Sequence, residues 1–237
     1  MQHPPTSKTA RISEIFSSLQ GEGTLAGQRH LFIRFEECHI HCEYCDELHK
    51  KGRDFTLEEV LEQVNLLETT SGPHSFVSLT GGEPLLYVSF LKSLMPLLKA
   101  KGFRIYLETN GILGKALEEV IGGCDLIAMD IKLPSVTKED NFIGEHEQFI
   151  KQAQTKELFV KIIVSKDLFF PEFEEALKLI EKYAPGSPVI LQPVSNQREG
   201  HEDLELMDFL MEMQKRGMAI HRDLRILPRF HRILNLR

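Results

Sequence analysis

The sequence predicts an α/β fold with a mostly parallel sheet, arranged as a partial (β/α)6 barrel or as an open doubly wound sheet. Short apolar runs alternate along the chain with amphipathic stretches of helical length, which is typical of βα units. The apolar runs are also nearly continuous, as expected for strands that are covered on both faces. The 237 residues are 42% hydrophobic, so the chain can build a large core.

The first half of the chain supplies three strands and three helices. Residues 30–35 (HLFIRF) are apolar and aromatic and predict the first strand. Residues 56–68 predict a helix, because five apolar side chains recur at helical spacing: Leu57, Val60, Leu61, Val64 and Leu67. Thr56 and Glu59 form a capping box at its start. The same patterns then predict a strand at 75–80, a helix at 89–100, a strand at 103–108 and a helix at 114–121.

The second half continues the alternation. Strands are expected at 125–131, 158–164, 188–194 and 223–228, and helices at 138–154, 172–183 and 202–216. Residues 1–10 are polar and lack the apolar core of a secretory signal, so we expect a flexible tail followed by a single domain over 11–237. No apolar run approaches 18 residues, so no membrane span is expected and a cytoplasmic location is the default. The net charge of −7 does not favour nucleic acid.

Polar side chains gather where the predicted strands end. The segments that follow five strands contain, in order, three cysteines, residues 80–84 (TGGEP), 108–111 (ETNG), 130–132 (DIK) and 192–195 (QPVS). Ligands of parallel α/β sheets bind at the carboxyl ends of the strands, so these segments are expected to share one site. Ordinary turn chemistry is an alternative explanation for Asn110, Gly111 and Pro193.

The cysteines have the spacing C-x3-C-x2-C: Cys38, Cys42 and Cys45. In a reducing compartment, clustered thiols usually bind a metal or a cluster. A structural zinc site needs four ligands, which His41 or His49 would complete as Cys3His. Three unconnected buried cysteines are a weaker alternative. Three thiolates fit best a [4Fe–4S] cluster with one iron left open for another ligand. Cys124 is expected to be a small buried apolar residue.

The cysteine spacing, together with Gly81-Gly82-Glu83-Pro84 after the next strand, resembles the radical S-adenosylmethionine (SAM) superfamily. Residues 14–23 (EIFSSLQGEG), 27–28, 31–34, 45–46, 108–111 and 225–231 resemble the 7-carboxy-7-deazaguanine synthase family. The LQGEG segment is the most specific part, and the resemblance runs from about residue 11 to the C-terminus. It implies a partial (β/α)6 TIM-like barrel of the radical SAM type.

The resemblance implies residue roles. The three motif cysteines would hold the cluster, and SAM would contact Tyr44, Asp46, Gly82, Glu83, Asp130, Ile131 and Lys132. The substrate would contact Leu19, Gln20, Gly21, Glu22, Arg34 and Thr80. The family's reaction is a radical ring contraction of 6-carboxy-5,6,7,8-tetrahydropterin to 7-carboxy-7-deazaguanine, with loss of ammonia, toward queuosine. A surface role is the alternative for Lys132 and Arg34, and turn formation for Gly21 and Gly23.

Three positions depart from the family pattern. Glu47 stands where Thr or Ser commonly binds magnesium, Glu37 where Gly is favoured, and Tyr44 where Trp is usual. A carboxylate is a hard oxygen donor, so Glu47 is a possible Mg²⁺ ligand.

Other functions and partners remain open at this stage. A glycyl-radical activating enzyme would keep the radical chemistry and act on a protein, and a Cys3His zinc module would not be an enzyme. The resemblance implies a homodimer and a reducing partner such as flavodoxin or ferredoxin. The acidic chain would need a basic patch to dock an acidic flavodoxin, for which the candidates are Arg222, Arg225, Arg229, Arg232 and Arg237; substrate-side contacts are the alternative.

Overall fold

The nine strands found among the described residues hydrogen-bond into one sheet. The computed structural model describes residues 9–45, 50–194 and 204–234. The strand order is β3-β1-β2-β4-β5-β6-β7-β8-β9, and every pairing from β2–β4 to β8–β9 is parallel. The bounds are β1 (Thr9–Leu19), β2 (Arg29–Phe35), β3 (Arg53–Thr56), β4 (Phe76–Gly81), β5 (Arg104–Thr109), β6 (Leu126–Ile131), β7 (Glu157–Val164), β8 (Val189–Pro193) and β9 (Leu224–Ile226).

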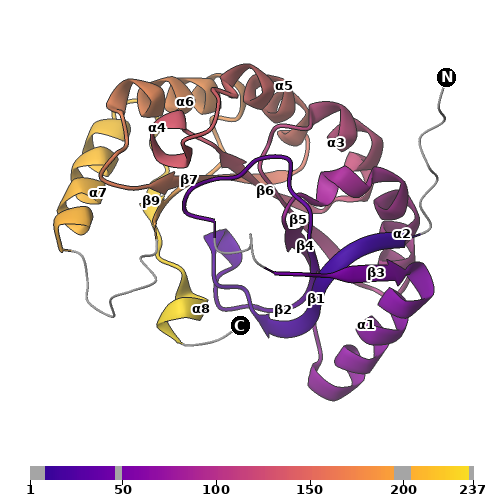
Figure 1. Cartoon of the computed structure of the whole chain (residues 1–237). Coiled ribbons are helices and arrows are strands. Elements are labelled where there is room, and N and C mark those ends of the chain that lie inside the picture. Colours follow the sequence, from indigo (N-terminus) through magenta and orange to yellow (C-terminus); the bar gives the residue numbers. More distant parts are fainter. Residues whose placement is uncertain (1–8, 46–49, 195–203, 235–237) are drawn as a thin grey trace.

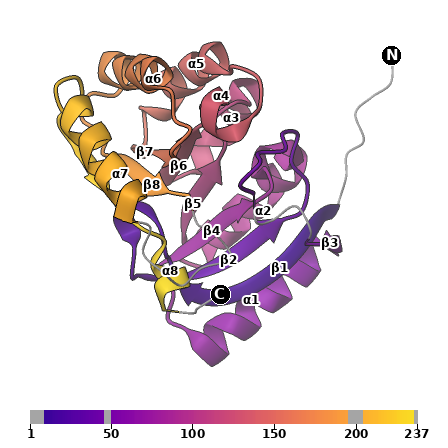
Figure 2. The same cartoon turned by 60° about the vertical axis from the view of Figure 1, so that its left-hand side comes forward.

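The helices lie mainly along the outer face of the curved sheet, as Figures 1 and 2 show. The α-helices are α1 (Leu57–Ser71), α2 (Val88–Ala100), α3 (Gly114–Val120), α4 (Pro134–Thr137), α5 (Ile143–Ala153), α6 (Phe170–Tyr183), α7 (Leu204–Gly217) and α8 (Phe230–Ile233). Three 3-10 turns are η1 (Gly23–Leu25), η2 (Pro84–Tyr87) and η3 (Ile121–Gly123). The predicted mostly parallel partial barrel is confirmed. The capping box of α1 is also present, with both Thr56–Glu59 hydrogen bonds formed.

The sheet has two different faces. The outer face packs against the helices and forms the main hydrophobic core, which includes Leu79, Leu107 and Ile162. The inner face carries a second, smaller group, here called the inner apolar layer: Phe76, Tyr106, Leu126, Ala128, Phe159 and Ile190. Nearer the carboxyl ends, the inward positions become polar and form what we call the inner polar layer: Arg34, Thr80, Glu108, Asp130, Lys161 and Gln192.

The structure adds two strands that the sequence patterns missed. β1 pairs antiparallel with both β2 and β3, so one edge of the sheet is antiparallel. The tail predicted for residues 1–10 is therefore wrong at its end, because Thr9 and Ala10 belong to β1 and Ala10 is buried. The helix predicted at 138–154 begins only at Ile143, after the short α4 and a left-handed Lys138.

The segment after β9 returns to the opposite edge of the curved sheet. The main-chain N–H of Phe230, at the start of α8, donates to the carbonyl oxygen of Gly21 at 2.8 Å. Figure 2 shows α8 beside the segment that follows β1. This contact joins the two ends of the sheet across its inner face. Within the described ranges, no helix is long and apolar enough to span a membrane.

Candidate active site

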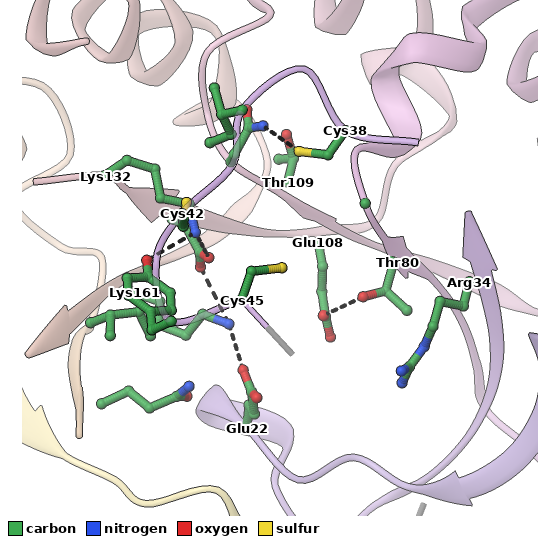
Figure 3. Close-up of a pocket in the computed structure, with 18 of the residues that line it drawn as sticks. Glu22, Arg34, Cys38, Cys42, Cys45, Thr80, Glu108, Thr109, Lys132 and Lys161 are labelled. Atoms are coloured by element: carbon green, nitrogen blue, oxygen red, sulfur yellow. Dashed lines mark hydrogen bonds and ion pairs between the residues drawn. The ribbon is translucent and has the colours of Figure 1, made fainter. Parts of the chain in front are cut away.

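A pocket lies at the carboxyl ends of the parallel strands, on the inner face of the sheet (Figure 3). Every segment that the sequence placed at this edge contributes to it. The lining side chains come from the cysteine loop, from the inner polar layer and from residues 80–82 and 108–110, with Glu22, Tyr44, Lys132, Ile163 and Arg229. The prediction that these strand ends converge is therefore confirmed.

The loop after β2 places all three motif cysteines on this pocket. Main-chain N–H groups hold the loop against the end of α4 and the residues that follow: the N–H of Glu43 donates to the Thr137 carbonyl at 3.0 Å, and the N–H of His41 to a Glu139 carboxylate oxygen at 2.8 Å. Burial raises the pKa of both the Cys38 and the Cys42 thiol. A cation that binds the thiolates would offset this effect.

Gly81 and Gly82 allow the cysteine loop to lie directly against the end of β4. Gly81 has φ +115°, and a Cβ there would lie 2.2 Å from the carbonyl oxygen of Phe35. A Cβ on Gly82 would lie 2.1 Å from the carbonyl oxygen of Glu37. Both positions therefore require glycine, because any side chain would push β4 away from the cysteine loop.

Glu83 is fully buried beneath the pocket and does not line it. The Thr109 hydroxyl donates to both of its carboxylate oxygens at 3.0 Å, and the N–H groups of Leu85 and Asn110 donate at 3.0 and 2.8 Å. Burial raises the pKa of Glu83 to about 7 despite these bonds. The carboxylate thus anchors the end of β5, and its expected contact with the SAM ammonium stays a prediction.

An ion-pair chain crosses the pocket from the end of β1 to β6 and β7. Lys161 pairs with Glu22 at 2.5 Å and with Asp130 at 3.3 Å, and Lys132 pairs with Asp130 at 2.8 Å. Burial opposes the charged forms, yet the lysines keep the pKa values of Glu22 and Asp130 below their usual range. The carboxylates in turn raise the pKa values of Lys132 and Lys161. All four groups are therefore charged at neutral pH.

His146 on α5 connects two of the pocket segments. Its Nδ1 lies 2.9 Å from the carbonyl oxygen of Gly111, and its Nε2 accepts the main-chain N–H of Lys132 at 3.0 Å. These contacts assign the neutral tautomer with the proton on Nδ1. Burial lowers the pKa of His146 to about 4, so this neutral form persists well below pH 7. The ring thereby fixes the main chain beside Lys132.

The opposite side of the pocket is built around Glu108. Gln20 donates from Nε2 to one oxygen of Glu108 at 2.8 Å, and the Thr80 hydroxyl donates to the other at 2.7 Å. Burial raises the pKa of Glu108. Arg34 lies beside Thr80 on the paired strand, with its guanidinium 3.7 Å from Glu14. Gln192 is 2% exposed, and its side-chain oxygen has no hydrogen-bond partner within the described residues, so it offers an acceptor to a ligand.

The predicted site residues divide into three groups. Those that line the pocket are Cys38, Cys42, Cys45, Glu22, Arg34, Tyr44, Thr80, Gly82, Asp130 and Lys132. Those whose side chains do not line it are Leu19, Gln20, Gly21, Glu83 and Ile131; Ile131 packs in the outer core instead. Asp46 and Glu47 lie outside the described residues, and so does His49.

The basic patch proposed for a reductase stays a prediction, because the side chains of Arg232 and Arg237 lie outside the described residues. Arg225 makes a two-bond ion pair with Asp223 at 2.6 and 2.7 Å. Arg229 turns into the pocket, where its Nε is 4.0 Å from Glu22, while Arg222 is exposed. The alternative of a substrate-side contact therefore fits Arg229.

Sequence reasoning assigned no role to Glu108, Asn110, Lys161 or Gln192, although all four line the pocket. A signal existed for Lys161, which is the one charged residue inside the apolar run 158–164. Glu108, Asn110 and Gln192 had been placed at strand ends without a role. Cys124 is 1% exposed and its thiol faces the Val120 carbonyl, which confirms it as a buried residue outside the site.

The donor set fits a [4Fe–4S] cluster. Three cysteine sulfurs face one pocket, and cysteine thiolates are the usual ligands of such clusters. Among the described residues, no three His, Cys, Asp or Glu groups form a site for a single metal ion. Charged and amide groups also surround the cysteines, as a polar ligand of the remaining iron requires.

Comparisons with known proteins identify the family. The radical SAM superfamily matches residues 32–184. A 7-carboxy-7-deazaguanine synthase from Geobacter sulfurreducens is 35% identical over 95% of this chain and 97% of its own length. The chain belongs to the 7-carboxy-7-deazaguanine synthase family of radical SAM enzymes. A second family member, from Methanopyrus kandleri, is 31% identical over 94% of this chain and 93% of its own.

Solved structures agree with this fold. QueE from Escherichia coli superposes with a TM-score of 0.65 over 95% of this chain and 96% of that one, at 20% identity. TYW1 with a lysine-pyruvate adduct bound gives a TM-score of 0.60 at 14% identity, over 83% of this chain and 75% of that one. Membership of the 7-carboxy-7-deazaguanine synthase family makes the chain an enzyme of lyase type and implies a [4Fe–4S] cluster and SAM.

Proposed function

We propose that this enzyme converts 6-carboxy-5,6,7,8-tetrahydropterin to 7-carboxy-7-deazaguanine, with ring contraction and loss of ammonia. The observation that carries the proposal is the division of the pocket into two sides. Three thiols and Lys132 with Asp130 form one side, and Arg34, Thr80 and Glu108 form the other. A radical formed on the first side meets a polar, carboxylate-binding surface on the second.

The second side matches a pterin that carries a carboxylate. Arg34 has the planar fork that binds carboxylates with two hydrogen bonds. Glu108 and Glu22 present carboxylate oxygens to the N–H groups of a pterin edge, and Gln20 fixes the orientation of Glu108. The pocket holds four cationic side chains and three acids, and burial raises the pKa of one of those acids, Glu108. This excess of positive charge favours anionic ligands.

The cofactor side has the groups that SAM binding requires. When bound, the cluster and SAM together supply a 5′-deoxyadenosyl radical that takes a hydrogen atom from the substrate. The motif cysteines hold the cluster, and Gly82 keeps their loop against β4. Asp130 offers a carboxylate to a ligand ammonium or hydroxyl, and Lys132 offers an ammonium to a ligand carboxylate. Tyr44 packs over Lys132, whose Nζ lies 5.7 Å from the ring centre.

Two partner assignments extend the proposal. Glu47 would act as an oxygen ligand for Mg²⁺ beside the substrate carboxylate. Chelation followed by Mg²⁺ add-back tests this: unchanged activity throughout would remove magnesium from the reaction.

A flavodoxin or ferredoxin would supply the electron, and stopped-flow reduction of the cluster by each protein compares them directly.

One incubation tests the reaction and the substrate together. The reconstituted enzyme is mixed anaerobically with SAM, dithionite and 6-carboxytetrahydropterin, and 7-carboxy-7-deazaguanine is sought by mass spectrometry. We expect product in amounts that match SAM cleavage. SAM cleavage with no such product would contradict the proposal.

Arg34→Lys keeps the positive charge and loses the two-pronged guanidinium, so we expect a raised KM for the pterin and unchanged SAM affinity.

A further inference from the structure

One side chain connects the end of β5 to a cysteine of the cluster motif. The Nδ2 group of Asn110 donates a hydrogen bond to the sulfur of Cys38, at 3.9 Å (Figure 3, dashed line at Cys38). Asn110 is 5% exposed, so water does not compete freely with this bond. No other side chain donates to a sulfur of the motif within the residues that the structure describes.

The orientation of the Asn110 amide is fixed by a second contact. Its Oδ1 accepts the main-chain N–H of Ile112 at 3.2 Å, so the nitrogen of the amide must face Cys38. The main chain of Asn110 is held as well, because its N–H donates to the buried Glu83 at 2.8 Å. The donor is therefore pre-organised by the protein and does not depend on a bound ligand.

A hydrogen bond to a cluster sulfur changes the energy of adding an electron. Reduction places negative charge on the cluster and its thiolates, and an N–H dipole aimed at a sulfur stabilises that charge. We propose that Asn110 is a positioning residue that raises the reduction potential of the [4Fe–4S] cluster through its hydrogen bond to Cys38. This inference rests on the cluster that the family implies, and it is independent of which substrate the enzyme uses.

The test compares three variants of the reconstituted full-length enzyme. Asn110→Leu has a similar size and removes the donor. Asn110→Asp keeps an oxygen for Ile112 and replaces the donor with a charged acceptor. Asn141→Leu is the matched control, because Asn141 accepts the N–H of Ile143 in the same local arrangement at 3.0 Å without lining the pocket. Iron and sulfide are measured first, so that every sample carries the same cluster content.

The main measurement is a potentiometric titration followed by electron paramagnetic resonance, without SAM or pterin. At a fixed potential near the wild-type midpoint, we expect the reduced-to-oxidised ratio to fall about tenfold in Asn110→Leu. That change corresponds to a midpoint about 59 mV more negative for one electron. The midpoint potential of Asn110→Asp should be more negative still, and that of Asn141→Leu should match the wild type. If the Asn110 variants carry the full cluster content and still show the wild-type midpoint potential, the proposal is overturned.

A second measurement uses only the wild-type protein, so it does not depend on cluster assembly in a variant. Wild-type protein that carries ¹⁵N in its asparagine side chains is reduced, and hyperfine coupling between the cluster electron and that nitrogen is sought by pulsed resonance. We expect a weak coupling across the N–H···S contact. Its absence would overturn the proposal, whereas failure of the pterin reaction alone would not affect either measurement.

Discussion

The inner apolar layer and the inner polar layer lie on the same strands and face the same way. Phe159 and Lys161 are two residues apart on β7, and Tyr106 and Glu108 are two apart on β5. An even offset keeps both side chains on one face of a strand. The apolar layer thus closes the base of the curved sheet, and the polar layer opens at the carboxyl ends. Position along a strand, and not the choice of face, decides whether an inward side chain reaches the pocket.

The two layers also treat ionisable groups differently. His30 faces the apolar layer. The centre of its ring lies 5.0 Å from that of Phe76 and 5.5 Å from that of Tyr106. Burial, with His74 as a second cause, lowers the pKa of His30 to about 4, so the ring is neutral. Lys161, two positions beyond the apolar layer, stays charged because Asp130 and Glu22 flank it. The comparison predicts that substitutions in either layer can lower stability, but that only those in the polar layer impair the chemistry of the folded enzyme.

The largest expected effect is the complete loss of chemistry without loss of fold. Cys42→Ala removes one of three cluster ligands, so we expect no stable cluster and no SAM cleavage. The circular dichroism spectrum should be retained, because the core does not depend on the cluster. Cys124→Ala is the matched control and should keep iron, sulfide and SAM cleavage. Unfolding of Cys42→Ala would show that the fold itself depends on the cluster cysteines.

Lys161→Met tests whether the polar layer depends on its central cation. Removing this lysine leaves Glu22 and Asp130 buried without their shared partner, which costs about 3–5 kcal/mol of unfolding free energy. Urea unfolding measures this loss of unfolding free energy. The deficit should shrink as the pH falls, because protonation of Glu22 and Asp130 removes the charges that Lys161 compensates. Lys166→Met breaks an exposed pair with Glu205 and should change little. Equal losses in the two variants would refute the argument.

Leu126→Ala tests the apolar layer. Leu126 is fully buried, so truncation should cost about 2–5 kcal/mol of unfolding free energy through lost burial and a cavity. The rate of SAM cleavage per cluster should stay within about twofold of the wild type at a temperature where both are folded. Leu66, at 55% exposed, provides a surface control as Leu66→Ala. A large loss of rate in Leu126→Ala would erase the distinction between the two layers.

His30 predicts a pH effect on stability. Between pH 6.5 and about 4 the unfolded chain binds a proton at His30 that the folded protein does not, so stability falls as the pH falls. The slope is about 1.4 kcal/mol per pH unit for one proton. His30→Asn keeps a polar group for Ser78 and should reduce the slope by this amount, measured by urea unfolding at several pH values. An unchanged slope would mean that His30 is charged in the folded protein.

Sequence patterns predicted the parallel strands because each is a compact apolar run that is buried on both faces. They did not predict β1 and β3, because neither has a clear period of its own and each is defined by a partner distant in sequence. The cysteine motif and the glycine pair were readable because their spacing alone restricts the chemistry. Lys161 was not assigned, and Arg229 was left between two roles, because the role of each depends on which side chains face it across the sheet.

The hydrogen bond between Phe230 and Gly21 has a consequence for synthesis on the ribosome. Strands β2 and β4 to β9 add to the sheet in the order in which they are translated, so each can pair with its neighbour soon after it emerges. The contact that closes the inner face must wait for residue 230, although its acceptor was made at residue 21. The cysteine loop can therefore meet β4 before Arg229, which lines the same pocket, has been made.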